Sequence, residues 1–230
     1  MLNALPSFIT MLNACSGLVA IYVNHPVYSS ILILLGGVCD VLDGTVARWL
    51  GVQSEVGKQL DSLSDAITFG LAPSYLVYHH VFVYSSDSVY LSLFSSIVLP
   101  VFAIIRLAMF NVDMRQRDIF IGLPTPAMAL FFIGLVTHYY YQSEWLIEKG
   151  VMRFLLSLPF FFAAMMILPI PMLSFKKINP YLIAVIAVSM IFLWIFQWAG
   201  LTMAIISYIL LSCIKVLIEG YVINNKQRKL

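Results

Sequence analysis

The sequence predicts an all-α integral membrane protein, built as a bundle of about eight transmembrane helices in a single domain over residues 1–230. The first observation is composition: 61% of the 230 residues are hydrophobic and 10% are charged, whereas soluble domains have about 45–50% apolar and about 25% charged residues. The second is spacing, because polar pieces interrupt the apolar runs at intervals near the roughly 20 residues that cross a bilayer as a helix. Helices are expected because lipid offers the backbone no hydrogen-bond partners.

Eight apolar segments follow one another along the chain. The expected spans are residues 6–24, 28–50, 59–84, 88–112, 123–141, 151–173, 180–198 and 201–222. In chain order, the turn-forming or charged pieces between them are "NHP", "GVQSEVG", "SSDS", "DMRQRDIFIG", "QSEWLIEKG", "SFKKINP" and "WAG". The first segment is expected to remain as a span and not to be a cleaved signal peptide, since Arg48 is the first basic residue.

The basic residues predict the orientation in the membrane. Of the 13 Lys and Arg residues, all but Lys149 and Arg153 fall in loops, or in helix halves leading to loops, on the side of the two termini. Positively charged loops are retained in the cytoplasm. We therefore expect a multi-pass protein of the cell membrane, with both termini and the loop near residues 51–57 on the cytoplasmic side. The net charge of +2 gives no reason to expect nucleic acid as a partner.

Four aspartates interrupt the second and third apolar segments. Asp40 and Asp43 are three residues apart, and Asp61 and Asp65 are four apart, so each pair lies on one face of its helix. The two helices are antiparallel and joined by a short loop, so the two faces can converge. A single aspartate at the bilayer centre costs about 2.5–3.5 kcal/mol on insertion scales. A positive charge is therefore expected between them.

Two sources of that positive charge are possible. All-oxygen ligands select a hard cation, Mg²⁺ or Mn²⁺, and the four histidines map near the opposite membrane face. The alternative is a buried network in which the carboxylates pair with Arg48, Lys58 or Arg106. The small residues Gly44 and Ala47 leave room for a ligand beside the acids, and Arg48 can offer a planar fork to a phosphate. Carboxylate-bound metals beside an arginine suit phosphoryl transfer.

The acidic stretch resembles the signature of the CDP-alcohol phosphotransferases. It reads D-V-L-D-G-T-V-A-R, eight residues, then G-K-Q-L-D-S-L-S-D, and it meets every position of D-x2-D-G-x2-A-R-x8-G-x3-D-x3-D. The resemblance implies the helical membrane fold of that family, often a homodimer. It also implies two divalent metal ions, Mg²⁺ or Mn²⁺, held by Asp40, Asp43, Asp61 and Asp65. Asp65 would also be the general base that deprotonates the incoming alcohol.

Within the family, the chain most resembles the bacterial and archaeal phosphatidylserine synthases. The stretches "LPSFITMLNACSGLVAIY", "GKQLDSLSDAITFGLAPSYLVY", "RLAMFN" and "GLPTPAMA" carry this resemblance. It implies CDP-diacylglycerol and L-serine as substrates. The residues implied for the CDP site are Asn13, Asp40, Gly44, Ala47 and Arg48. Relatives usually have a second arginine where Met109 stands, so the serine carboxylate is assigned to Arg106, Arg115 or Arg117.

Several alternatives remain open at this level. Arg106 could instead only neutralise the aspartates, and the turn "GLPTP" could position substrate or be purely structural. Another acceptor alcohol, such as glycerol 3-phosphate, inositol phosphate or choline, would use the same chemistry. A cation transporter would use the acids as an ion pathway, but such a pathway needs polar residues across the membrane, and the second and third segments are mostly apolar beyond their acids.

Overall fold

The computed structural model describes residues 4–83, 89–112, 120–141, 149–173 and 180–227. Within these ranges the chain forms eight helical segments and one pair of two-residue strands. Four helices in this part of the chain are long and apolar enough to cross a membrane, and they lie at Leu5–Val23, Pro26–Leu50, Val89–Val112 and Trp198–Ile218. The predicted all-α, multi-pass membrane fold is confirmed.

The first two helices form an antiparallel hairpin. α1 (Leu5–Val23) and α2 (Pro26–Leu50) each begin with a proline in the first turn, where its missing N–H costs no helical hydrogen bond. The residues that directly follow the two helices, Asn24 after α1 and Gly51 after α2, both have left-handed backbone angles (φ 45° and 66°). The sharp stop after α2 turns the chain back toward the bundle.

The third segment is one continuous helix with two wide turns. It consists of α3 (Glu55–Asp65), the π-helical turn η2 (Ala66–Leu71), α4 (Ala72–Val77) and the π-helical turn η3 (Tyr78–Phe82). The Ser54 hydroxyl caps its start by accepting a hydrogen bond from the Gly57 N–H at 3.0 Å. The first π-helical turn begins directly after Asp65, and such turns are frequent at functional sites.

The remaining elements complete the bundle. They are α6 (Val89–Val112), β1 (Phe120–Ile121), α7 (Thr125–Tyr141), α8 (Lys149–Ile167), β2 (Pro171–Met172), α9 (Pro180–Phe196) and α10 (Trp198–Gln227). The expected span 151–173 was wrong at its end, because the helix stops at Ile167 and residues 171–172 pair with β1 in antiparallel register. Two prolines, Pro169 and Pro171, lack the N–H that helix continuation needs.

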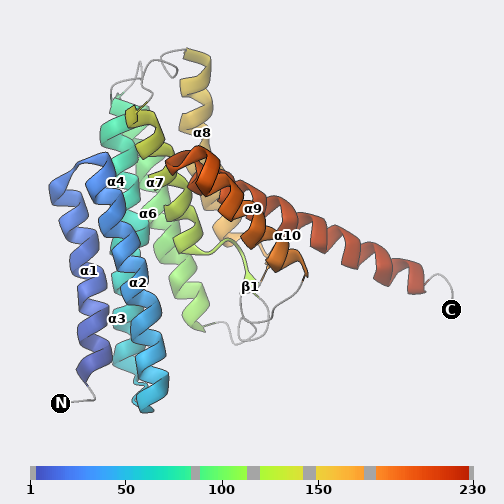
Figure 1. Ribbon diagram of the computed structural model, residues 1–230, viewed down its shortest axis with the longest axis horizontal. Coiled ribbons are helices and arrows are strands. Elements are labelled where there is room, and N and C mark those ends of the chain that lie inside the picture. Colours follow the sequence, from blue (N-terminus) through green and yellow to red (C-terminus); the bar gives the residue numbers. More distant parts are fainter. Residues whose placement is uncertain (1–3, 84–88, 113–119, 142–148, 174–179, 228–230) are drawn as a thin grey trace.

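Figure 1 shows α1, α2 and the α3–η3 segment side by side at the end of the bundle that carries the N-terminus. α6 packs on η2 and α8, α7 packs on α2 and α4, and α10 packs on α7 and α9. The last part of α10 projects away from the other helices (Figure 1). A continuous apolar core joins α4, η3, α6, α7 and α8, with Leu76, Leu99 and Phe132 completely buried. Asp40, Asp43 and Asp61 lie outside this core, in a pocket lined by residues of α1, α2 and α3.

Candidate active site

The loop between α2 and α3 aligns the two acidic helix faces. Gly51 closes α2 through its backbone N–H, which reaches the carbonyl of Arg48 at 3.3 Å. The capped start of α3 then follows after three residues. Because the connection is so short, Asp40 on α2 is placed opposite Asp61 and Asp65 on the returning helix.

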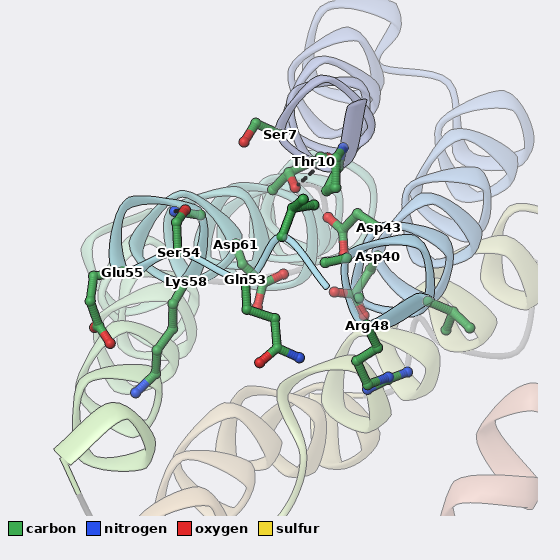
Figure 2. Close-up of a pocket in the computed structure, with 16 residues that line it drawn as sticks. Ser7, Thr10, Asp40, Asp43, Arg48, Gln53, Ser54, Glu55, Lys58 and Asp61 are labelled. Atoms are coloured by element: carbon green, nitrogen blue, oxygen red, sulfur yellow. Dashed lines mark hydrogen bonds between the residues drawn. The ribbon is translucent and has the colours of Figure 1, made fainter. Parts of the chain in front are cut away.

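Three of the four carboxylates converge. One oxygen from each of Asp40, Asp61 and Asp65 lies within 4.8 Å of the other two. Asp43 is outside this group, but it lines the same pocket and is only 4% exposed. Its Oδ2 atom is buried and has no hydrogen-bond partner among the described residues. Figure 2 shows Asp40 and Asp43 from α2 facing Asp61 from α3, with Thr10 of α1 beside them.

The donor set fits a hard divalent cation. Two oxygens bound to one Mg²⁺ lie at most about 4.2 Å apart, so side-chain shifts of less than about an ångström would bring this cluster to that spacing. The buried Asp43 oxygen without a hydrogen-bond partner is a further potential metal ligand, and leaving it without a partner is costly. The residues present therefore suit one or more oxygen-coordinated metal ions.

The three cations considered for a buried ion-pair network, Arg48, Lys58 and Arg106, each donate a hydrogen bond to another partner. None of the four carboxylates forms a direct ion pair within the described part of the chain. Arg48 donates through Nη2 to the Thr45 hydroxyl at 3.3 Å, and Lys58 donates to the carbonyl of Asn111 at 2.9 Å. Arg106 donates through Nη1 to the Thr125 hydroxyl at 3.0 Å.

A pocket of about 790 Å³ opens beside the acids. Its walls come from α1, α2, the 52–54 connection and the start of α3, and Arg48 and Lys58 extend along its rim (Figure 2). Gly44, Ala47 and Arg48, which the sequence assigned to the CDP site, all line it. A Cβ atom added at Gly44 would meet nothing within 4 Å. The missing side chain therefore leaves room in the pocket and is not needed for helix packing.

Asn13, which the family resemblance assigned to the CDP site, contacts Asp65. It is completely buried and is not among the residues that line the pocket. Its Nδ2 atom donates to Asp65 Oδ1 at 3.2 Å, from behind the acidic cluster. This contact orients the Asp65 carboxylate, so Asn13 acts on the site by positioning Asp65.

Sequence reasoning missed the hydrogen bonds that join α1 to the third segment. Ser64 donates to the carbonyl of Thr10 at 3.1 Å, and Thr68 donates to the carbonyl of Asn13 at 2.9 Å. The available signal was the spacing of four between Ser64 and Thr68, which places both hydroxyls on one helix face next to Asp65. The spacing of three between Ser7, Thr10 and Asn13 likewise marked one polar face on α1. Ser7 and Thr10 line the pocket.

The arginines assigned to the serine carboxylate are only partly placed. Arg106 is buried on α6 at 7% exposure, and it interacts electrostatically with Asp65. It does not line the 790 Å³ pocket. Arg115 and Arg117 lie outside the described residues.

Comparison with known proteins now defines the class. The sequence profile of the CDP-alcohol phosphatidyltransferases matches residues 3–158, about two thirds of the chain. The chain belongs to the CDP-alcohol phosphatidyltransferase family and is therefore a transferase. The matched region contains all four aspartates and the whole pocket, and it ends within α8.

Individual relatives narrow the resemblance. The chain is 40% identical over 148 residues to the CDP-diacylglycerol–serine O-phosphatidyltransferase of Methanocaldococcus jannaschii, covering 63% of this chain and 68% of that protein. It is 33% identical over 137 residues to the Bacillus subtilis protein of the same name, covering 58% and 76%. The Helicobacter pylori protein of that name is 32% identical over 169 residues, covering 70% and 68%. The match to the Mycobacterium leprae protein, also of that name, spans 47% of that longer chain.

Proposed function

We propose that this chain transfers the phosphatidyl group of CDP-diacylglycerol to the hydroxyl of L-serine, giving phosphatidylserine and CMP. The observation that carries the proposal is the convergence of Asp40, Asp61 and Asp65 beside an open pocket. All three residues belong to the acidic motif of the family. The names of the relatives support serine as the acceptor. The serine oxygen attacks the lipid-linked phosphorus, the bond to the bridging oxygen of the diphosphate breaks, and CMP leaves.

Each acidic residue has a proposed role. Asp40, Asp43, Asp61 and Asp65 hold two divalent ions, Mg²⁺ or Mn²⁺. When bound, such ions would stabilise the negative charge that develops on the transferring phosphate and on the leaving CMP. Asp65 takes the proton from the serine hydroxyl. The hydrogen bond from Asn13 to Oδ1 supports this role because it orients the Asp65 carboxylate.

The nucleotide is proposed to occupy the 790 Å³ pocket. Gly44 and Ala47 allow its approach to α2, and Arg48 at the rim is suited to a phosphate oxygen. Both termini and this pocket are proposed to face the cytoplasm, as the distribution of Lys and Arg indicates. The diacylglycerol chains enter laterally from the bilayer, and a homodimer is proposed from the family resemblance.

A panel of alcohols tests which acceptor the protein uses. The purified protein in detergent micelles with CDP-diacylglycerol and Mg²⁺ or Mn²⁺ is expected to release CMP with L-serine. Glycerol 3-phosphate, inositol phosphate and choline are expected to support little release. Preferential release with one of these three would reassign the acceptor. No release with any of the four would refute the activity.

A further inference from the structure

Arg106 is held in one orientation by two contacts. Its Nη1 atom donates to the hydroxyl of Thr125, which is completely buried at the first turn of α7. Its guanidinium carbon lies 5.5 Å from the centroid of the Phe110 ring, one turn further along α6. A guanidinium fixed at one nitrogen and covered on one face keeps its plane, and a fixed plane favours two-point recognition of a carboxylate or phosphate.

The position of this guanidinium suits an amino acid that reacts at its hydroxyl. Only two carbon atoms separate the hydroxyl oxygen of serine from the carboxylate carbon. A base for the hydroxyl and a cation for the carboxylate must therefore be neighbours. Asp65 and Arg106 lie on segments that meet. α6 packs on η2, which begins directly after Asp65. In addition, Asn111 of α6 donates to the hydroxyl of Ser62 on α3 at 2.8 Å.

We propose that Thr125 is a positioning residue for acceptor selection, which holds the Arg106 guanidinium for the carboxylate of serine. The inference rests on the proposed function. It assigns a role to the turn "GLPTP", and it makes the start of α7 part of the acceptor site although Thr125 need not touch the acceptor.

The turn before Thr125 is rigidly fixed by backbone contacts. Gly122 has φ 76°, and its N–H donates to the carbonyl of Ile170 at 2.9 Å. A Cβ atom at Gly122 would lie 2.4 Å from the carbonyl oxygen of Met166, so no larger residue fits. The N–H of Leu123 donates to the carbonyl of Met165 at 2.9 Å. The backbone contacts to the end of α8 and to the segment just before β2 therefore fix the position of Thr125.

α10 holds this arrangement from the other side. The Tyr208 hydroxyl donates to the carbonyl of Leu173 at 3.0 Å, and the N–H of Leu173 donates to the Ser212 hydroxyl at 3.3 Å. Leu173 directly follows β2, which pairs with β1 just before Gly122. A continuous set of contacts thus connects α10, which lies beyond the family match, to the guanidinium of Arg106.

The test compares Thr125→Val, which removes the hydroxyl at nearly constant volume, with Thr125→Ser, which keeps it. CMP release is measured at varied serine and varied CDP-diacylglycerol. Thr125→Val is expected to raise the KM for serine about 10- to 100-fold, the range expected from losing one hydrogen bond to a charged group. The KM for CDP-diacylglycerol should stay within about twofold, and Thr125→Ser should restore the KM for serine to within about threefold of the parent.

A matched control lies on the same helix. Thr137 of α7 is also completely buried, and its hydroxyl contacts Ser30 at 2.8 Å and the carbonyl of Pro26 at 3.3 Å, far along the helix from Arg106. Thr137→Val is expected to lower thermal stability and to leave the KM for serine unchanged. In an Arg106→Leu background, Thr125→Val should cause no further rise in that KM, because the two residues act as one unit.

Different outcomes refute different statements. A parent protein that releases no CMP with serine refutes the proposed function and this inference with it. An active parent whose Thr125→Val variant keeps its KM for serine, or changes both KM values equally, refutes the inference alone. If Thr125→Val does not fold, Thr125→Ala replaces it, and an unchanged KM for serine in that variant refutes the inference. A rise in the metal concentration needed for activity, with an unchanged KM for serine, would show that Arg106 only balances charge.

Discussion

Gly44 offers a direct test of where the nucleotide binds, because its missing side chain serves the pocket and not the packing. In most helix–helix contacts a glycine allows two backbones to approach, and alanine then clashes. At Gly44 an added Cβ would meet nothing within 4 Å, and the position lies on the pocket wall. Replacing this residue with alanine should therefore separate stability from activity.

The expected change in stability is a gain. Alanine in a helix interior is more favourable than glycine by about 0.5–1 kcal/mol. For a chain of this size, that corresponds to a Tm increase of about 1–4 °C in detergent. Gly17 provides the contrast, since its Cβ would lie 2.7 Å from the Thr68 Cα atom. Overpacking of this kind costs about 1–3 kcal/mol, so Gly17→Ala should lower the Tm.

The expected change in activity is a loss. A methyl group at Gly44, and more strongly the side chain of Gly44→Leu, would occupy space proposed for the nucleotide. The KM for CDP-diacylglycerol should rise in the order Gly, Ala, Leu, while the KM for serine stays nearly constant. The assay is CMP release at varied CDP-diacylglycerol, beside thermal unfolding of the same preparations. A lower Tm for Gly44→Ala would contradict the packing argument, and an unchanged KM in Gly44→Leu would place the nucleotide elsewhere.

The other predictions concern the acidic cluster and its supports. Asp61→Ala should lose Mn²⁺ binding and CMP release together, and Mn²⁺ binding retained at parent affinity, measured by electron paramagnetic resonance, would contradict its role as a ligand. Asp65→Asn should retain much of the binding of CDP-diacylglycerol while kcat falls about 10²–10⁴-fold, the usual contribution of a general base; equal loss of lipid binding would argue against that role. Asn13→Ala should lower kcat about 10-fold or more, because the lost hydrogen bond goes to a charged group, and an unchanged kcat would show that the contact to Asp65 is not used. Arg106→Leu should raise the KM for serine strongly, and Arg106→Lys should restore only part because it lacks the planar fork; a serine KM that barely moves in Arg106→Leu would shift the assignment to Arg115 or Arg117.

The sequence was sufficient to predict the fold class and the acidic hairpin. Membrane helices follow from apolar length, since lipid leaves the backbone no other way to satisfy its hydrogen bonds. Asp40, Asp61 and Asp65 could be brought together from their spacing, because three- and four-residue intervals place side chains on one helix face. Their pairing across the short loop near Gly51 then required no further information.

The arrangement around the cluster could not be predicted in the same way. The buried place of Asn13 depends on how closely α1 approaches the third segment, and that distance is set by contacts between Gly17, Gly36 and Thr68. The π-helical turn after Asp65 changes the rotation of the following residues, and no pattern of apolar residues indicates it. The strand at Pro171–Met172 lies where a helix end was expected. This pairing could not be predicted, because its partner β1 lies about fifty residues earlier in the chain.

Metal-assisted transfer to serine is tested most directly by the incorporation of isotope-labelled serine into lipid. The purified protein is reconstituted in liposomes that contain CDP-diacylglycerol, and labelled phosphatidylserine and CMP are measured in the same samples, with Mn²⁺ and with a chelator. We predict equal amounts of the two products with Mn²⁺, and neither product with the chelator or in Asp61→Ala. CMP released without labelled lipid, or labelled lipid formed at the parent rate in the chelator, would contradict the account.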